Sequence, residues 1–315
     1  MPLAVKGEKP GLHGIAKGIM VFPRRKGLRM VISAAIIILC FLFLGYRLYR
    51  NWALLTSYSW EIHFIPLILS FVVYTLELSL ATLGWSSITA RLAGLSDLHK
   101  NLKIYWAANL GKLLPGTVWY IAGRVYLYEQ EGVAKAVTAM NSLLELVLLV
   151  LAGAVVSLSF LPLLSTPQWL KNPLVLVAIV PLGLLLVHPW TIGGLWRRVG
   201  RAEMPESLRW RDTLTWLAIY AGVWMGGGLV LYWAINAFYT LPLTYLPQVI
   251  GVWALSELTT YISLVSPSGL GIREVALSVL LGYYIPAPIA VVVALAVRIG
   301  LIVYEAFWAV VALRL

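Results

Sequence analysis

The sequence predicts an all-α polytopic membrane protein. Its composition and its long apolar runs, separated by basic loops, carry this prediction. Hydrophobic residues make up 61% of the 315 residues and charged residues 12%, with a mean hydropathy of +0.86. Soluble domains carry about twice that charged fraction. We therefore expect a basic cytoplasmic segment over residues 1–29, followed by a single membrane domain over residues 30–315.

The uninterrupted apolar runs predict about six full spans, because about 20 residues suffice to cross a bilayer. The runs are Met30–Tyr46, Ile62–Leu92, Val133–Phe160, Pro173–Val187, Thr213–Phe238 and Ala287–Leu313. The first run follows a segment rich in Lys and Arg, which indicates an uncleaved signal anchor with its N-terminus in the cytoplasm. Basic loops at residues 91–103 and 190–212 fall on the same side, so we expect a multi-pass protein of the plasma membrane.

Two further apolar stretches, residues 104–124 and 249–284, contain proline and glycine and predict re-entrant hairpins. The interruptions are Pro115 and Gly116 in the first stretch and Pro267, Gly269 and Gly271 in the second. Broken backbone at membrane depth is tolerated only where protein buries it or it lines a wet cavity. If both stretches crossed fully, the basic loops between them would change sides, so hairpins that return are favoured.

The chain also suggests an internal repeat, with halves at about residues 62–160 and 213–313. Each half reads as a span, a broken hairpin and a span, and the two halves enter the membrane from opposite sides. Paired interrupted segments in an inverted repeat point to a transporter binding site near the midplane. The alternative is that two unrelated membrane loops both contain proline and glycine.

An arginine follows each break, Arg124 in the first hairpin and Arg273 in the second. A guanidinium presents a planar fork of donors that matches phosphate oxygens. A helix that begins at the Gly269 and Gly271 break would add free N–H groups for the same anion. The alternative is that each arginine neutralises a nearby acid, Glu274 for Arg273 and Glu129 for Arg124.

Carboxylates inside the apolar runs are further candidates, because an unpaired one is costly in hydrocarbon. Glu77, Glu145 and Glu257 occupy such positions. They would pair with the arginines, relay protons or meet a cationic headgroup. Arg298 and Glu305 are two helical turns apart and predict an ion pair inside the bundle.

Glycine and aromatic residues have simpler interpretations. Gly222, Gly226 and Gly228 predict close helix packing. The fourteen tryptophans and sixteen tyrosines are expected in belts at the membrane interfaces.

The sequence lacks the usual signs of enzyme or metal chemistry. Cys40 is the single cysteine, the four histidines have no ligand spacing, and the two aspartates, Asp97 and Asp212, lie far apart in loops. No nucleotide-binding or hydrolase motif occurs. We therefore expect no catalytic residue, metal or cofactor. The net charge of +11 sits beside apolar runs, which favours anionic lipid headgroups at the cytoplasmic face over nucleic acid.

The second break carries a family resemblance. Ser-Pro-Ser-Gly-Leu-Gly-Ile-Arg-Glu-Val-Ala-Leu, residues 266–277, resembles the S-P-G-G-L-G-x-R-E-x-A-L signature of the flippase-like membrane domain of lysylphosphatidylglycerol synthases, in its stand-alone form. Leu114-Pro-Gly and Gly123-Arg124 are similar to its earlier L-P-G…G-x-R element. Ser268 replaces the usual glycine, and the aminoacyl-transferring domain is absent, which puts an aminoacyl-lipid substrate in doubt.

The resemblance implies a flippase that moves lipids with polar heads between leaflets. The expected substrate is a phosphate-bearing lipid: a phospholipid, an aminoacyl-lipid or a polyprenyl-phosphate-linked lipid. The candidate binding residues are Arg273, Glu274, Arg124, Glu257, Glu145, Pro115, Gly116, Pro267, Gly269 and Gly271. The alternative is a non-catalytic accessory subunit that presents a lipid carrier to a partner such as a glycosyltransferase. An intramembrane transferase is the least favoured reading.

Overall fold

The computed structural model describes residues 27–113, 119–165, 174–199, 208–262 and 270–314. These residues are helical, with short connections and no strand among them, which confirms the predicted all-α class. The breaks predicted at Pro115, Gly116, Pro267 and Gly269 lie outside the described residues, and so does most of the basic N-terminal segment.

The helices follow one another along the chain. They are α2 (Gly27–Arg50), α3 (Trp52–Ser57), α4 (Phe64–Ala93), α5 (Leu98–Asn109), η1 (Leu110–Leu113), α6 (Trp119–Gln130), α7 (Lys135–Phe160), η2 (Leu161–Leu163), α8 (Leu174–Leu186), α9 (Pro189–Val199), α10 (Trp210–Asn236), η3 (Leu243–Tyr245), α11 (Leu246–Ile262), α12 (Ile272–Leu281) and α13 (Ala287–Arg314).

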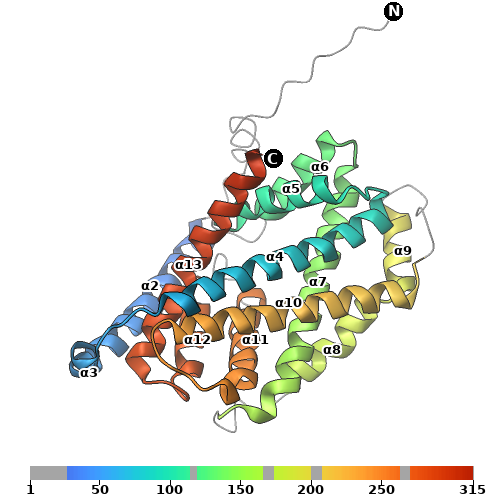
Figure 1. Cartoon of the computed structure of the whole chain (residues 1–315). Helices are drawn as coiled ribbons and strands as arrows, with labels where there is room; N and C mark the ends of the chain where they lie inside the picture. The colour runs from blue at the N-terminus through green and yellow to red at the C-terminus, as the bar shows by residue number, and fades with distance from the viewer. Residues whose placement is uncertain (1–26, 114–118, 166–173, 200–207, 263–269, 315) are drawn as a thin grey trace, which may run out of the picture.

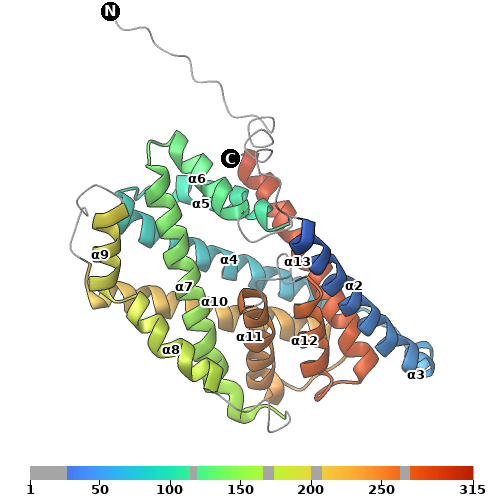
Figure 2. The same ribbon diagram turned by 180° about the vertical axis from the view of Figure 1, so that it is seen from behind.

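The long helices α4 and α10 lie side by side along one face of the bundle (Figures 1 and 2). Glycines on α10 permit its close packing against α4 and α11. A Cβ added at Gly226 would come within 3.3 Å of the Glu77 side chain on α4, and one at Gly228 within 2.6 Å of the Ile250 Cα on α11. The predicted close packing at these glycines is therefore confirmed.

Four helices within the described part of the chain are long and apolar enough to cross a membrane. They are Phe64–Ala93, Lys135–Leu163, Trp210–Asn236 and Ala287–Ala312. A fifth candidate is the pair α8 and α9, whose apolar parts meet at a bend of 54°. The protein is thus a helical membrane protein with four to five candidate spans among these residues. The expected first span coincides with α2, and its crossing of the membrane remains a prediction.

The predicted span Pro173–Val187 needs correction. Helix α8 has 13 residues, about 20 Å at 1.5 Å per residue, which is shorter than the hydrocarbon core of about 30 Å. The chain bends after Leu186 and continues as α9, where the sequence predicted a polar loop. Pro189 begins α9, because proline is well tolerated at the first position of a helix.

Both interrupted stretches form pairs of packed helices. Helix α5 packs on α6, and α11 packs on α12. Asp97 begins α5 by accepting a hydrogen bond from the Lys100 backbone N–H at 3.1 Å. Glu131, in the turn after α6, accepts a hydrogen bond from the Lys100 ammonium at 2.7 Å and thereby raises the pKa of Lys100. This contact joins the outer ends of the first pair.

The start of α12 depends on Gly271, whose φ of +86° is a conformation that residues with a Cβ rarely adopt. The Glu274 side chain accepts a hydrogen bond from the Gly271 N–H at 2.6 Å, which fixes this turn and satisfies a free donor. A Cβ at Gly271 would also lie 2.7 Å from the Cβ of Cys40 on α2. Helix α2 therefore lies directly against the start of α12.

Aromatic residues contribute more to the interior than the sequence predicted. Trp85 and Tyr220 are fully buried, and Trp216 is 1% exposed. The Trp216 indole N–H donates to the Ser87 hydroxyl at 2.9 Å, which satisfies its polar end. The assignment of the aromatic residues to interfacial belts was wrong for these positions, since they are buried in the core of the bundle.

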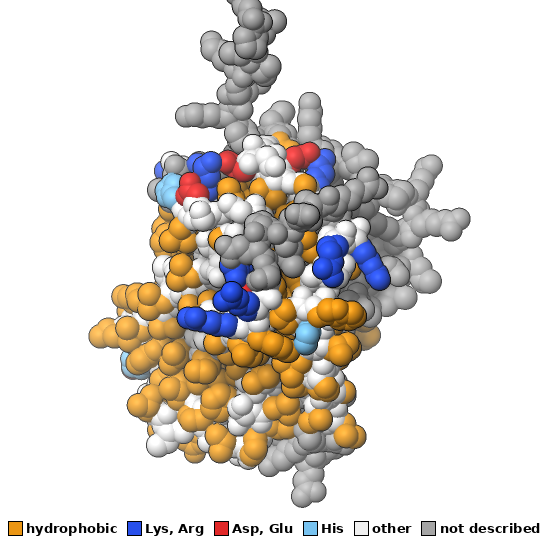
Figure 3. All heavy atoms as spheres, turned by 90° about the vertical axis from the view of Figure 1, so that its right-hand side faces the viewer, with side chains coloured by type: hydrophobic (Ala, Val, Ile, Leu, Met, Phe, Trp, Pro, Cys, Tyr) orange, Lys and Arg blue, Asp and Glu red, His pale blue; other side chains and the backbone are white. Residues whose placement is uncertain are grey.

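The surface has an uneven distribution of charge. In Figure 3, charged side chains gather in the upper half of the visible face, and its lower part is mostly hydrophobic. Exposed large apolar residues on α2, α4 and α13 include Leu39, Ile65 and Ile299, with exposed fractions of 64%, 74% and 63%. A surface of this kind is unfavourable in water and suits a hydrocarbon environment.

Candidate functional site

The first candidate arginine, Arg124 on α6, forms an ion pair with Glu145 on α7. Both side chains are 1% exposed. The other carboxylate oxygen of Glu145 accepts hydrogen bonds from the hydroxyls of Tyr105 on α5 and Tyr220 on α10, at 3.1 and 3.0 Å. Both oxygens of Glu145 therefore have partners, and four helices meet at this carboxylate.

Aromatic rings enclose the Arg124 guanidinium. Its central carbon lies 4.2 Å from the Trp85 ring centre, 4.3 Å from that of Tyr105 and 5.1 Å from that of Tyr120. Such contacts stabilise a cation that has been removed from water. The buried pair and its aromatic surroundings leave Arg124 little access to a ligand in this conformation.

The second candidate arginine, Arg273 on α12, pairs with Glu257 on α11. The Arg273 guanidinium also lies 5.1 Å from the ring centre of Trp253 on α11. The Arg273 and Glu257 side chains are 8% and 14% exposed, so this pair is less enclosed than the first one. The Nη2 of Arg273 is buried without a hydrogen-bond partner among the described residues.

Glu274 pairs with Arg298 and not with the adjacent Arg273. Its carboxylate accepts the Gly271 N–H and lies 3.6 Å from the Nε of Arg298 on α13. Glu274 is 1% exposed and Arg298 19% exposed. This carboxylate therefore links the beginning of α12 to α13.

The charged groups of α11, α12 and α13 form one cluster, which we call the hairpin cluster: Glu257, Arg273, Glu274, Arg298 and Glu305. Glu257 interacts electrostatically with the four others. Tyr74 on α4 donates a hydrogen bond to Glu305 at 3.2 Å and interacts electrostatically with Arg273. All five members lie in the second predicted repeat half, and Tyr74 of the first half contacts them.

The alternative in which each arginine neutralises an acid nearby in the sequence does not hold, because both arginines pair with an acid on another helix. Adjacent residues on a helix do not face each other, and side chains meet at spacings of three or four. Arg273 therefore pairs with Glu257 and not with Glu274, which follows it directly. Arg124 does not pair with Glu129, five residues later, whose carboxylate binds Lys135 at 3.0 Å on the surface.

The structure separates the predicted site residues into two groups. Arg124 and Glu145 lie together as a buried ion pair between α6 and α7, and Arg273, Glu274, Glu257 and Gly271 lie together at the second hairpin. Sequence reasoning did not single out Tyr74 or Trp253. In the sequence these two residues are marked only by lying three or four positions from a glutamate on the same helix. Other aromatic residues of this chain have the same spacing, so it does not identify a site.

No protein-family model matches this chain, and a search of the curated proteins found no match.

Proposed function

We propose that this protein is a lipid translocase and that the hairpin cluster binds the phosphate of its substrate. The buried Nη2 of Arg273, which lacks a hydrogen-bond partner among the described residues and belongs to the more exposed of the two buried arginine pairs, is the observation that carries this proposal. Leaving a charged donor unsatisfied in the interior is costly, so a ligand oxygen there would be stabilising. Phosphate oxygens match the planar donor fork of a guanidinium, and every phospholipid carries them.

Intramembrane charges at a helix break support this proposal. Arg273 and Glu274 follow the positive-φ Gly271 at the first turn of α12, between α11 and the apolar α13. Ionisable residues among membrane-spanning helices generally mark the path of a polar substrate. The first turn of α12 adds a helix N-terminus, whose dipole favours an anion.

The packing of the hairpins favours an inverted repeat with six spans, in which α2 and the bent pair α8 and α9 complete the set. The first helix of each hairpin packs on the closing helix of the other half: α5 on α13, and α11 on α7. Each hairpin also packs its second helix on its own closing helix, α6 on α7 and α12 on α13. Such reciprocal packing between the halves is expected if two related halves assembled around one axis.

The charge distribution favours a plasma-membrane protein with a cytoplasmic N-terminus. Arg197, Arg198 and Arg211 are exposed, and Arg91 is partly exposed near the ends of α4 and α10. Lys and Arg concentrate on the cytoplasmic side of membrane proteins and attract anionic lipid headgroups there. This arrangement would bring phosphate-bearing lipids to the protein.

Leaflet exchange in proteoliposomes tests the proposal. The probe is phosphatidylglycerol with a fluorescent headgroup, and dithionite quenching reports its movement between leaflets. We expect wild-type protein to exchange the probe and Arg273→Lys to slow exchange about 10- to 100-fold, because a hydrogen bond to a charged group contributes about 1.5–3 kcal/mol. The lysine keeps the positive charge beside Glu257 but lacks the fork of donors.

Arg314→Lys is the matched control, because Arg314 is an exposed arginine at the end of α13. The rate of lipid exchange by this variant should equal that of the wild type. Gel filtration shows whether each variant is folded. Equal rates for Arg273→Lys and the wild type would remove Arg273 from the site. Absence of exchange by folded wild-type protein, for phosphatidylglycerol and for a polyprenyl phosphate, would refute the translocase and favour an accessory subunit that co-purifies with a lipid-modifying enzyme.

A further inference from the structure

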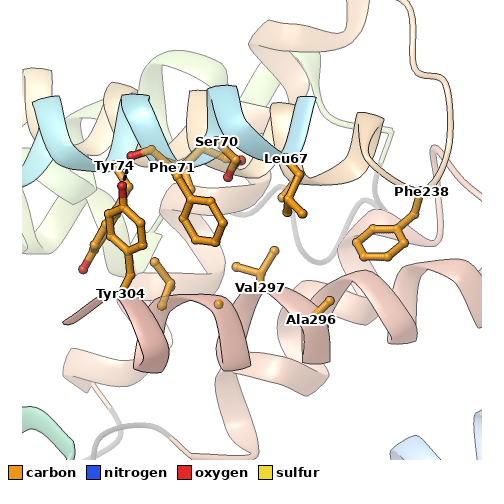
Figure 4. A pocket seen from close by; sticks show the side chains of 12 residues that line it. Leu67, Ser70, Phe71, Tyr74, Phe238, Ala296, Val297 and Tyr304 are labelled. Atoms are coloured by element: carbon orange, nitrogen blue, oxygen red, sulfur yellow. Dashed lines mark hydrogen bonds between the residues drawn. The ribbon is translucent and has the colours of Figure 1, made fainter. Parts of the chain in front are cut away.

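An apolar groove lies next to the hairpin cluster, between α4, α10 and α13. Its volume is about 110 Å³. Figure 4 shows Leu67, Phe71, Phe238 and Val297 around it. The groove is thus formed by three of the helices that are long and apolar enough to cross a membrane.

The polar atoms that line the groove are already used within the protein. The Ser70 hydroxyl donates to the Val230 carbonyl at 3.1 Å, and the Tyr304 hydroxyl donates to the Phe71 carbonyl at 2.6 Å. The Phe71 and Tyr304 rings are stacked, with centres 4.5 Å apart. A groove without free polar groups does not hold water well, so its natural occupant is apolar.

Gly300 on α13 provides the room in the groove. A Cβ added there would meet no atom within 4 Å, whereas one at Gly228 would collide with a neighbouring helix. Ile68, next to Leu67, and Ile299, next to Gly300, are 59% and 63% exposed. The groove is therefore flanked by surface that faces hydrocarbon when the helices span a membrane.

Tyr74 links one end of the groove to the hairpin cluster. This residue lines the groove, and its hydroxyl donates to Glu305 at 3.2 Å. Arg273 interacts electrostatically with the same tyrosine. A molecule with a phosphate at Arg273 and a hydrocarbon chain in the groove would match both environments.

We propose that the groove between α4, α10 and α13 binds a hydrocarbon chain of the phosphate-bearing lipid whose headgroup occupies the hairpin cluster. This inference rests on the proposed function and adds the place of the chain. Tyr74 marks the boundary between the headgroup site and the chain site. The Nη2 donor of Arg273, which has no hydrogen-bond partner among the described residues, selects an amphiphile with phosphate oxygens in its headgroup, and the groove discriminates against a free phosphate or a soluble phosphosugar.

Photolabelling tests the inference. The probe is a phosphatidylglycerol with a diazirine in one acyl chain, incorporated into proteoliposomes of the full chain, and mass spectrometry maps the labelled peptides. We expect labelling at Phe71 and Tyr304. Gly300→Leu fills the groove and excludes about two methylene groups, which lowers labelling there and leaflet exchange on the order of tenfold.

Gly45→Leu is the matched control, because Gly45 on α2 also has no atom within 4 Å of an added Cβ and lies away from the groove. It should leave labelling and exchange unchanged. Ala296→Leu, one turn from Gly300, fills the same groove and is measured beside it, so the test stands if one variant misfolds.

The outcomes separate the two proposals. Loss of groove labelling in Gly300→Leu and Ala296→Leu, with Gly45→Leu unaffected, supports the chain site. If folded wild-type protein exchanges no lipid but shows this labelling pattern, the translocase fails and the chain site stands. Unchanged labelling and exchange in both groove variants would overturn the chain site and leave the translocase intact. Labelling spread evenly over exposed residues such as Ile38 and Ile299 would indicate surrounding lipid only and would also overturn it.

Discussion

Glu145→Ala is expected to destabilise the protein by about 3–5 kcal/mol, because it leaves the Arg124 charge buried without its counter-ion. Both side chains of this pair are 1% exposed, so water cannot replace the lost carboxylate. The substitution also removes the acceptor of the Tyr105 and Tyr220 hydroxyls. The measurement is the free energy of unfolding in detergent micelles, from a denaturant titration followed by tryptophan fluorescence.

The neighbouring surface pair provides the control for this prediction. Glu129→Ala breaks an ion pair with Lys135 whose side chains are 47% and 65% exposed, and such pairs contribute about 0–1 kcal/mol. Arg124→Met combined with Glu145→Met removes both charges, so the double variant should be more stable than Glu145→Ala. A loss of stability no greater for Glu145→Ala than for Glu129→Ala would show that the buried pair is not a structural element.

Gly228→Ala is expected to have the second-largest effect on stability. The added Cβ would lie 2.6 Å from the Ile250 Cα, and since this atom belongs to the backbone, α10 and α11 have to move apart. Forcing an extra carbon into a packed interior costs about 1–3 kcal/mol. The same denaturant titration measures this loss.

Gly45→Ala is the matched control for the glycine substitution. No atom lies within 4 Å of the added Cβ, so packing is unchanged, and alanine gains up to about 1 kcal/mol of helix propensity over glycine. The two substitutions should therefore differ in sign. If Gly228→Ala also stabilised the protein, the contact between α10 and α11 would be looser than the structure indicates.

The helices were predictable from the sequence because their signal is local. Uninterrupted apolar runs mark α4, α7, α10 and α13, and the predicted bounds of α13 differ by one residue from those found. The division between α8 and α9 was not predictable in the same way. A bend of 54° depends on how α8 packs against α7, and the average hydropathy of a run does not record such contacts.

The partners of the charged residues were less predictable than the residues themselves. Arg124, Glu145, Arg273 and Glu257 stood out because charge is costly inside apolar stretches. The pair of Arg124 and Glu145 joins residues 21 apart, across the turn between α6 and α7. Only the relative placement of α6 and α7 decides this contact, so proximity in the sequence does not identify the acid. Tyr74 illustrates the same limit, since its contact with Glu305 spans 231 residues.

The position of α2 has a consequence for biosynthesis. Its main tertiary contacts are with α12 and α13, and Arg47 donates a hydrogen bond to Ser278 at 3.3 Å across 231 residues. At translation rates of about 5–20 residues per second, α12 emerges on the order of 10–50 seconds after α2. During that interval the face of α2 that will meet α12 has no native partner. Insertion factors that shield single helices in the membrane are therefore expected to hold α2 until the second hairpin arrives.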